Sequence, residues 1–181
     1  MDYQRKFIAI KPSDVLDQLC NLRQLVFEVT DACNLRCTYC AYSNLYIGRD
    51  ARTGKYLSIE QAKVVIDYLT SLWRVHSLLG FPKRFCIGFY GGEPLLHFKL
   101  IKEIIEYIEC QKGIDKTLLY TITTNGLLLD KYIDYLAEKK FSLLISFDGD
   151  EQAQGFRVDL SGRNSFTQVY KNIKLIQQMS W

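Results

Sequence analysis

Four short apolar runs alternate along this chain with longer segments in which apolar residues recur at helical spacing. β-Branched and aromatic residues dominate the short runs, and this composition is typical of β-strands. The strands are predicted over 25–30, 85–90, 118–123 and 143–147. The helical spacing predicts helices over about 58–75 and 97–109, a third with Asp130 as its N-cap, and a fourth that follows Ser165.

Strand and helix alternate four times in this prediction. That order indicates an α/β fold of parallel βαβ units with right-handed crossovers. The strands look apolar on both faces, so we expect helices to cover both sides of the sheet. Ser58 with Gln61, and Ser165 with Gln168, each carry the capping-box signature of a helix start.

The composition is that of an ordinary globular protein. Of its 181 residues, 48% are hydrophobic and 24% are charged. The 23 basic and 20 acidic residues are interleaved, so no basic stripe of the kind that binds nucleic acid is present. No apolar run approaches the roughly 18 residues of a membrane helix, and the N-terminus does not resemble an export signal. We therefore expect a soluble, cytoplasmic protein with no membrane or nucleic-acid partner.

Polar or glycine-rich segments follow all four predicted strands. They are residues 31–40, 91–94, 124–126 and 146–149. In parallel α/β sheets, ligands gather at the C-terminal ends of the strands. Because these ends lie on one rim of the sheet, the sequence predicts one site there.

The first of these segments carries Cys33, Cys37 and Cys40 in a C-x3-C-x2-C pattern. Three thiolates this close can hold three irons of a [4Fe–4S] cluster and leave the fourth iron open to a small chelating ligand. The alternatives are a zinc site, for which this loop offers no histidine, and a dithiol pair. Disulfides are a further alternative for the six cysteines, but a chain without an export signal disfavours them.

The second segment is Gly91-Gly92-Glu93-Pro94. Two glycines would let a ligand approach the backbone closely, and Glu93 offers an acceptor for a ligand ammonium group. Pro94 has no N–H and ends the strand. The alternative is a plain strand-to-helix turn, which needs neither the second glycine nor the carboxylate.

In combination, these motifs resemble those of the radical S-adenosylmethionine (radical SAM) enzymes. The cysteine loop matches their cluster motif, including the aromatic Tyr39 before the third cysteine, and residues 89–94 match their second-strand motif. Residues 123–126 and 146–149 look like the third- and fourth-strand motifs of the SPASM-type branch that modifies peptides and proteins. That branch includes sulfatase maturases and maturases of ribosomally made peptides.

Residues 29–35 and 156–166 most resemble the peptide maturases of the GG-Bacteroidales type. The resemblance implies a partial (β/α) barrel. It also implies a [4Fe–4S] cluster that, once reduced by a low-potential donor of the flavodoxin or ferredoxin type, passes one electron to S-adenosylmethionine. The 5′-deoxyadenosyl radical so formed would remove a hydrogen atom from a precursor peptide or protein.

The resemblance also implies roles for individual residues. Cys33, Cys37 and Cys40 would be the metal ligands, with no catalytic residue beyond them. Glu93 would hold the amino group of the methionine moiety, Ser146 its carboxylate or the ribose, and Arg157 the carboxylate, although Arg157 also suits a surface loop. The implied cofactor-binding residues are Tyr39, Gly91, Gly92, Glu93, Asn125, Ser146 and Arg157.

The sequence departs from this family pattern in two respects. Residues 151–155 stand where members of the branch often carry a His-Asp pair. The family barrel has six strand–helix units, and four are predicted here. We therefore expect an N-terminal leader over 1–22, with one short strand around 7–10, and an incomplete core domain over 23–181, without an auxiliary-cluster domain. An inactive truncated remnant that binds a cluster or a partner peptide, and a sulfatase-maturase-like enzyme, are the alternative functions.

Five residues with reactive side chains are given structural roles. Cys86 is expected in the core, and Cys20 and Cys110 are expected to be free thiols. His97 is interpreted as a helix-start residue and Tyr90 as a packing residue.

Overall fold

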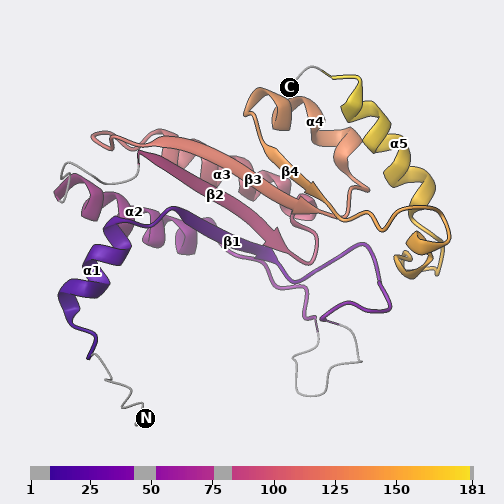
Figure 1. Ribbon diagram of the computed structural model, residues 1–181, viewed down its shortest axis with the longest axis horizontal. Helices are drawn as coiled ribbons and strands as arrows, with labels where there is room; N and C mark the ends of the chain where they lie inside the picture. Colours follow the sequence, from indigo (N-terminus) through magenta and orange to yellow (C-terminus); the bar gives the residue numbers. More distant parts are fainter. Residues whose placement is uncertain (1–8, 43–51, 76–82, 180–181) are drawn as a thin grey trace, which may run out of the picture.

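The computed structural model describes residues 9–42, 52–75 and 83–179. These residues form one layer of parallel strands with helices against one face (Figure 1). The α-helices are α1 (Pro12–Cys20), α2 (Ile59–Val75), α3 (Phe98–Glu109), α4 (Leu129–Glu138) and α5 (Phe166–Gln177). The strands are β1 (Gln24–Thr30), β2 (Arg84–Gly91), β3 (Thr117–Thr124) and β4 (Ser142–Ile145). Two short 3-10 helices, η1 (Pro94–His97) and η2 (Ala153–Phe156), follow β2 and β4.

The sheet has the order β1-β2-β3-β4, and every neighbouring pair is parallel. Its register places Val26 of β1 beside Gly88 of β2, and Gly88 beside Thr121 of β3. Because each strand pairs with the next strand in the chain, all four C-terminal ends lie at the same edge. The predicted parallel α/β architecture is confirmed.

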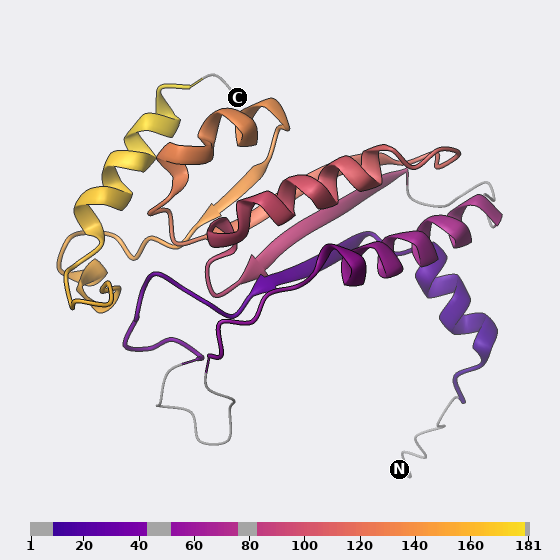
Figure 2. The same cartoon turned by 180° about the vertical axis from the view of Figure 1, so that it is seen from behind.

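Among the described residues, helices cover one face of the sheet and leave the other open, so the prediction of cover on both faces is wrong. Phe27, Phe89 and Ile122 point toward the helices and are buried. Val26 and Leu144, on the other face, are 51% and 64% exposed. Figure 1 looks onto this open face, whereas Figure 2 looks onto α2 and α3 packed against the opposite face. Short apolar runs do not distinguish the two arrangements, because apolar residues also occupy part of the open face.

The hydrophobic core lies between the sheet and its helices. Trp73 of α2 packs edge-on against Phe85 of β2, with ring centroids 4.6 Å apart. From α3, the fully buried Ile101, Ile104 and Ile105 enter the same core. Burial of each such side chain contributes on the order of 1.5–3 kcal/mol, so this core fixes the strand ends in place.

The predicted capping box at the start of α2 is confirmed. The Gln61 N–H donates to Ser58 Oγ at 3.1 Å, and the Ser58 N–H donates to Gln61 Oε1 at 3.0 Å. The predicted N-cap of α4 is wrong, because Leu128 takes that position and Asp130 lies in the first turn. Ser165 occupies the N-cap position of α5, but its hydroxyl accepts from Gln154 Nε2 at 3.2 Å and caps nothing.

Two other details differ from the predicted elements. Helix α1 lies in a segment for which no helix was predicted, and its one buried residue is Cys20, so its apolar signal is weak. The short strand predicted over 7–10 lies partly outside the described residues, and its last two positions adopt no regular structure. No helix within the described ranges is long and apolar enough to cross a membrane.

Replacement of Ser58 by Ala tests the capping box. The variant loses the acceptor for the Gln61 N–H, and we expect unfolding free energy to fall by about 1 kcal/mol. Ser71→Ala in the same helix is the control, because Ser71 is exposed and its hydroxyl bonds only within its own turn, to the Tyr68 carbonyl. In urea unfolding, the free energy of the control should lie within about 0.5 kcal/mol of wild type. Equal losses of unfolding free energy in both variants would contradict the capping role.

Candidate functional site

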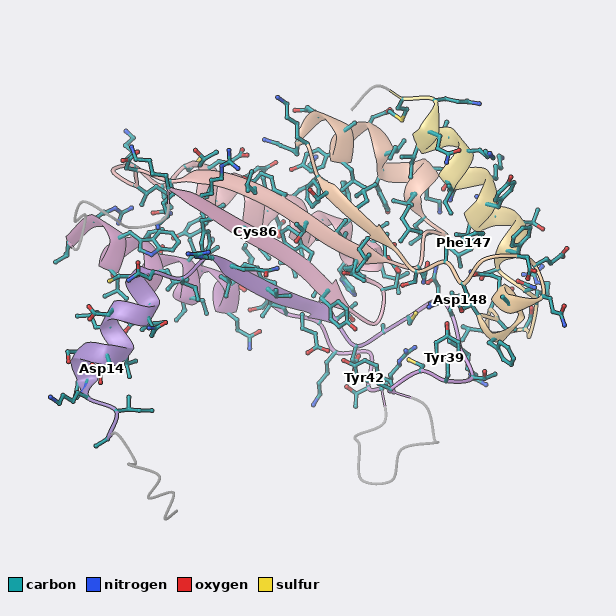
Figure 3. All side chains as sticks on the ribbon, in the orientation of Figure 1. Asp14, Tyr39, Tyr42, Cys86, Phe147 and Asp148 are labelled. Carbon is teal, nitrogen blue, oxygen red and sulfur yellow. The ribbon has the colours of Figure 1, made fainter. Side chains whose placement is uncertain are left out.

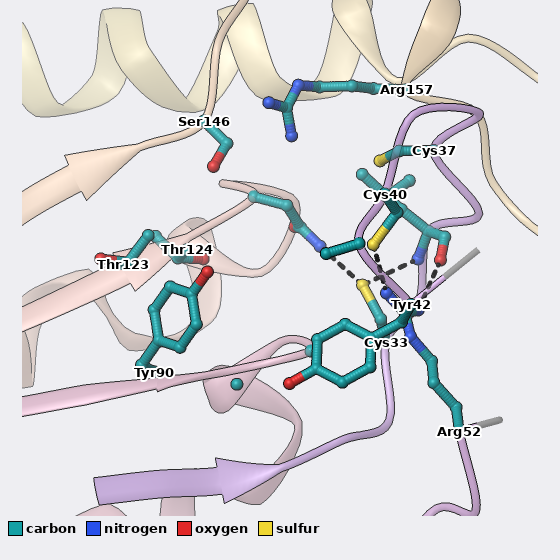
Figure 4. Close-up of a pocket in the computed structure, with 15 residues that line it drawn as sticks. Cys33, Cys37, Cys40, Tyr42, Arg52, Tyr90, Thr123, Thr124, Ser146 and Arg157 are labelled. Atoms are coloured by element: carbon teal, nitrogen blue, oxygen red, sulfur yellow. Dashed lines mark hydrogen bonds between the residues drawn. The ribbon is translucent and has the colours of Figure 1, made fainter. Parts of the chain in front are cut away.

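The C-terminal ends of the strands surround a cavity of about 200 Å³ (Figure 4). Its wall combines the cysteine loop after β1, the end of β2, the end of β3 and the segment after β4. All the predicted site residues except Tyr39 and Glu93 line it, namely Cys33, Cys37, Cys40, Gly91, Gly92, Asn125, Ser146 and Arg157. The topology thus brings together residues that lie more than 100 positions apart in the chain.

Nitrogen donors reach two of the three cysteine sulfurs, and a positive charge lies near the third. Cys33 Sγ accepts from the Leu35 N–H at 3.4 Å and from Asn125 Nδ2 at 3.7 Å. Cys40 Sγ accepts from Arg52 Nη2 at 2.9 Å. Burial raises the pKa of the Cys37 thiol, and the nearby Arg157 charge limits that rise.

This donor set fits a [4Fe–4S] cluster. Such a cluster takes each thiolate on a different iron, so its ligands border a cavity rather than converge on one point. Among the described residues, no three His, Cys, Asp or Glu side chains are grouped as ligands of a single metal ion. Hydrogen bonds from nitrogen to the ligand sulfurs are one of the features that set the potential of these clusters.

The glycine pair at the end of β2 is required by the protein's own backbone. A Cβ at Gly91 would lie 2.2 Å from the Thr30 carbonyl oxygen, and one at Gly92 would lie 2.2 Å from the Ala32 carbonyl oxygen. Gly91 also has a φ of +135°, which disfavours other residues. The Gly92 N–H donates to the Thr30 carbonyl at 2.7 Å. The start of the cysteine loop therefore rests directly on these two glycines.

Glu93 lies beneath the cavity and is fully buried. Its carboxylate accepts from the Asn125 N–H at 2.7 Å, the Thr124 hydroxyl at 2.8 Å and the Leu95 N–H at 3.1 Å. Burial raises the pKa of this carboxyl, and the three hydrogen bonds oppose the rise. The geometry therefore gives Glu93 partners within the protein, where the sequence suggested a ligand ammonium.

Tyr39 lies outside the cavity wall, beside Asp148 (Figure 3). Its hydroxyl donates to Asp148 Oδ2, and Arg157 Nε donates to the same oxygen at 2.9 Å. The Arg157 guanidinium also lies over the Tyr39 ring, with its central carbon 5.3 Å from the ring centroid. Burial would raise the pKa of Asp148, but the hydrogen bonds from Arg157 and Tyr39 outweigh it and hold that pKa below its usual value.

The segment after β4 holds the cysteine loop from the side opposite the glycines. The Arg36 N–H donates to the Val158 carbonyl at 2.7 Å, and the Thr38 N–H donates to the Phe156 carbonyl at 3.0 Å. An antiparallel bridge joins Leu35 to Asp159. The backbone of the cysteine loop is thus fixed by residues about 120 positions further along the chain.

Sequence reasoning missed several residues of the cavity wall. Arg52 and Tyr42 approach Cys40, and the Tyr42 hydroxyl donates to Glu28 Oε1 at 2.5 Å. Tyr90 had been interpreted as packing, but it is 49% exposed and lines the cavity. Alternation along β2 could have revealed Tyr90, because it shares a face with exposed positions; no local pattern marks Arg52.

The remaining cysteines and His97 lie away from the cavity. Cys20 is buried and Cys110 is exposed, and both are free thiols as expected. The expectation that Cys86 is a core residue is wrong, because it faces the open side of the sheet with Sγ 3.6 Å from Thr121 Oγ1. His97 is the N-cap of α3, as interpreted, and stacks on Tyr56.

Comparisons with known proteins agree with this geometry. The sequence profile described as the Radical SAM superfamily matches residues 27–181. A cysteine-type anaerobic sulfatase-maturating enzyme of Clostridium novyi is 24% identical over 87% of this chain and 41% of its own length. A GTP 3′,8-cyclase of Chlorobaculum tepidum is 40% identical over 61% of this chain and 28% of its own length.

Among solved structures, native anSMEcpe with bound AdoMet and Cp18Cys peptide superposes with a TM-score of 0.70. The match covers 87% of this chain and 40% of that chain at 21% identity, so it shows a shared fold. The chain thus spans less than half the length of these relatives.

Gly92→Ala tests the close packing of the cysteine loop. Its new methyl group must displace the Ala32 backbone, and we expect the free energy of unfolding to fall by about 1–3 kcal/mol. Gly155→Ala is the matched control, because the nearest atom to its Cβ would be 3.8 Å away. Chemical unfolding should show that control unchanged or stabilised by up to ~1 kcal/mol. Similar stability of the two variants would contradict the contact.

Asp148→Asn tests the link among Tyr39, Asp148 and Arg157. A lowered carboxyl pKa adds stability above the unfolded value of about 3.9, and that stability is lost as pH falls through the folded pKa. We therefore expect wild type to be more stable than Asp148→Asn at pH 6 and this difference to shrink below about pH 3.9. Thermal unfolding of the cluster-free protein measures it, with Asp134→Asn on α4 as the control for charge loss. A difference that is constant with pH would rule out the link.

Proposed function

The chain belongs to the radical SAM superfamily, and on this basis we propose that it uses a [4Fe–4S] cluster and S-adenosylmethionine to abstract a hydrogen atom from a peptide substrate. The observation that carries the proposal is the single cavity on which the three cysteines and the ends of the other strands meet. Members of this superfamily use both cofactors, as the sequence resemblance implied.

We assign the cluster to Cys33, Cys37 and Cys40. When bound, the cluster and S-adenosylmethionine supply the one-electron reduction and the radical chemistry. The protein positions the thiols through the two glycines beneath the loop and the backbone of residues 156–158 beside it. Nitrogen donors from Leu35 and Asn125 reach Cys33 and orient its side chain.

The methionine and ribose groups of S-adenosylmethionine are assigned to the wall beside the cysteines. Gly91 and Gly92 expose backbone there, and Asn125 and Ser146 add polar side chains. Arg157 extends over the cavity near Ser146 (Figure 4). Because Asp148 binds Arg157 through Nε, the two terminal nitrogens of the guanidinium can pair with a carboxylate in the cavity.

Tyr39 and Glu93 are proposed as positioning residues instead of cofactor contacts. Tyr39 orients Asp148, which in turn fixes the Arg157 side chain. Glu93 fixes the backbone of Asn125 at the end of β3. Both residues act on the cavity through a neighbour.

A peptide substrate is the proposal that best accounts for the extent of the similarity. The sulfatase-maturating relative aligns over 87% of this chain, whereas the GTP 3′,8-cyclase aligns over 61%. Residues 156–166 support the peptide-maturase branch of the GG-Bacteroidales type, because they hold the cysteine loop and also carry that resemblance. A low-potential electron donor and a cytoplasmic location complete the proposal.

Cys37→Ala tests this function. Loss of one of three ligands should remove the cluster, so iron and sulfide content and the cleavage of S-adenosylmethionine to 5′-deoxyadenosine should be lost together. Iron analysis and product chromatography after anaerobic reconstitution measure both quantities. Cys110→Ala is the matched control, because that thiol is exposed and lies away from the cavity.

Electron paramagnetic resonance of the dithionite-reduced protein tests the cofactor site directly. We expect a reduced [4Fe–4S] signal that changes when S-adenosylmethionine is added, because the open iron binds it. The proposal would be contradicted by a signal that S-adenosylmethionine does not change, or by cleavage of S-adenosylmethionine at the wild-type rate in Cys37→Ala. Zinc without iron after anaerobic purification would favour a structural zinc module.

A further inference from the structure

We propose that Arg52 is a positioning residue for the cluster ligand Cys40, and that its charge raises the reduction potential of the cluster. This inference rests on the proposed function. It assigns a role to a residue that lies 12 positions after the last cysteine of the motif and belongs to no recognised motif of the chain.

Arg52 makes contacts on three sides. Its Nη2 donates to Cys40 Sγ at 2.9 Å, and its Nη1 donates to the Leu35 carbonyl at 3.3 Å. The guanidinium lies over the ring of Tyr42, 5.1 Å from the centroid. The Tyr42 hydroxyl is fixed in turn by Glu28 on β1. These contacts hold the guanidinium against the sulfur and tie it to the sheet.

The Nε of Arg52 adds an independent observation. It is buried and, within the described residues, has no hydrogen-bond partner. A buried donor without a partner on a charged group destabilises the folded state. The fold therefore keeps this cation in the cavity wall at a cost to its own stability.

The charge of Arg52 acts on cluster reduction because the reduced cluster carries one more negative charge than the oxidised cluster. A cation in contact with a ligand sulfur stabilises the reduced form more than the oxidised form. Hydrogen bonds to the sulfurs act in the same direction and are a recognised control of these potentials. Part of the guanidinium is itself buried, which reduces the screening of its charge by water.

The opposite wall of the cavity provides an internal comparison. Arg157 shares Asp148 with Tyr39, so a carboxylate offsets its charge. Among the described residues, the groups that contact Arg52 are a sulfur, a carbonyl oxygen and an aromatic ring. The charge of Arg157 also acts on Cys37, whereas Arg52 donates a hydrogen bond directly to the sulfur of Cys40.

Arg52→Gln tests the inference, with Arg36→Gln as the matched control. Arg36 lies in the same loop, between two of the cysteines, but its side chain is exposed. The ratio of reduced to oxidised cluster is read by electron paramagnetic resonance at a fixed solution potential. We expect it to fall about tenfold in Arg52→Gln, which is 59 mV for a one-electron couple, and to change little in Arg36→Gln.

Arg52→Lys is the second variant, because it keeps the charge but loses the planar pair of donors. We expect its ratio to lie between those of wild type and Arg52→Gln. If Arg52→Gln holds no cluster, Arg52→Lys carries the test: a ratio of reduced to oxidised cluster below that of wild type supports the inference, and a folded Lys variant without cluster overturns the electrostatic role.

Three further outcomes separate this inference from the proposed function. An intact cluster with the wild-type ratio in Arg52→Gln, or an equal fall in Arg36→Gln, would overturn the role of Arg52 and leave the proposed function standing. A wild-type chain that assembles no [4Fe–4S] cluster after reconstitution would contradict the proposed function itself.

Discussion

The candidate site depends on the buried carboxylate of Glu93, because this one group joins the strand ends that frame the cavity. The carboxylate accepts from the Thr124 hydroxyl and the Asn125 N–H at the end of β3, and from the Leu95 N–H in η1. The Glu93 N–H donates to the Ala32 carbonyl in the cysteine loop. A buried carboxylate is costly unless such donors satisfy it. The arrangement therefore fixes three segments of the cavity wall relative to one another.

The cysteine loop obtains its shape from these neighbours. Gly91 and Gly92 let the backbone of Thr30 and Ala32 pass within contact distance, and the segment after β4 accepts two of the loop's N–H groups. Within the loop, regular structure is limited to turns and one bridge at Leu35. The spacing of the cysteines in space is thus set by long-range contacts, although their spacing in sequence identifies the motif.

Features with a local cause could be predicted from the sequence. Strand composition, helical spacing and the Ser58 capping box each depend on residues a few positions apart, and the parallel order follows from their alternation. The wall residues at the strand ends were predictable for the same reason, since topology places all four ends together. The sequence could not predict that helices cover a single face, because apolar positions such as Val26 and Leu144 lie on the open side.

What could not be predicted depends on contacts between distant segments. The type of residue at position 93 suggested a ligand group, but its burial and its three donors come from β3 and η1. Arg52 carries no signal in sequence, because its contacts with Cys40 and Tyr42 form only in the folded chain. The difference between the two arginines of the wall also appears only in the fold. Asp148 pairs with Arg157 and orients it, whereas Arg52 donates directly to a cysteine sulfur. A cavity that must hold a negatively charged cluster and also bind a carboxylate gains from that division, because the two tasks need a cation in different places.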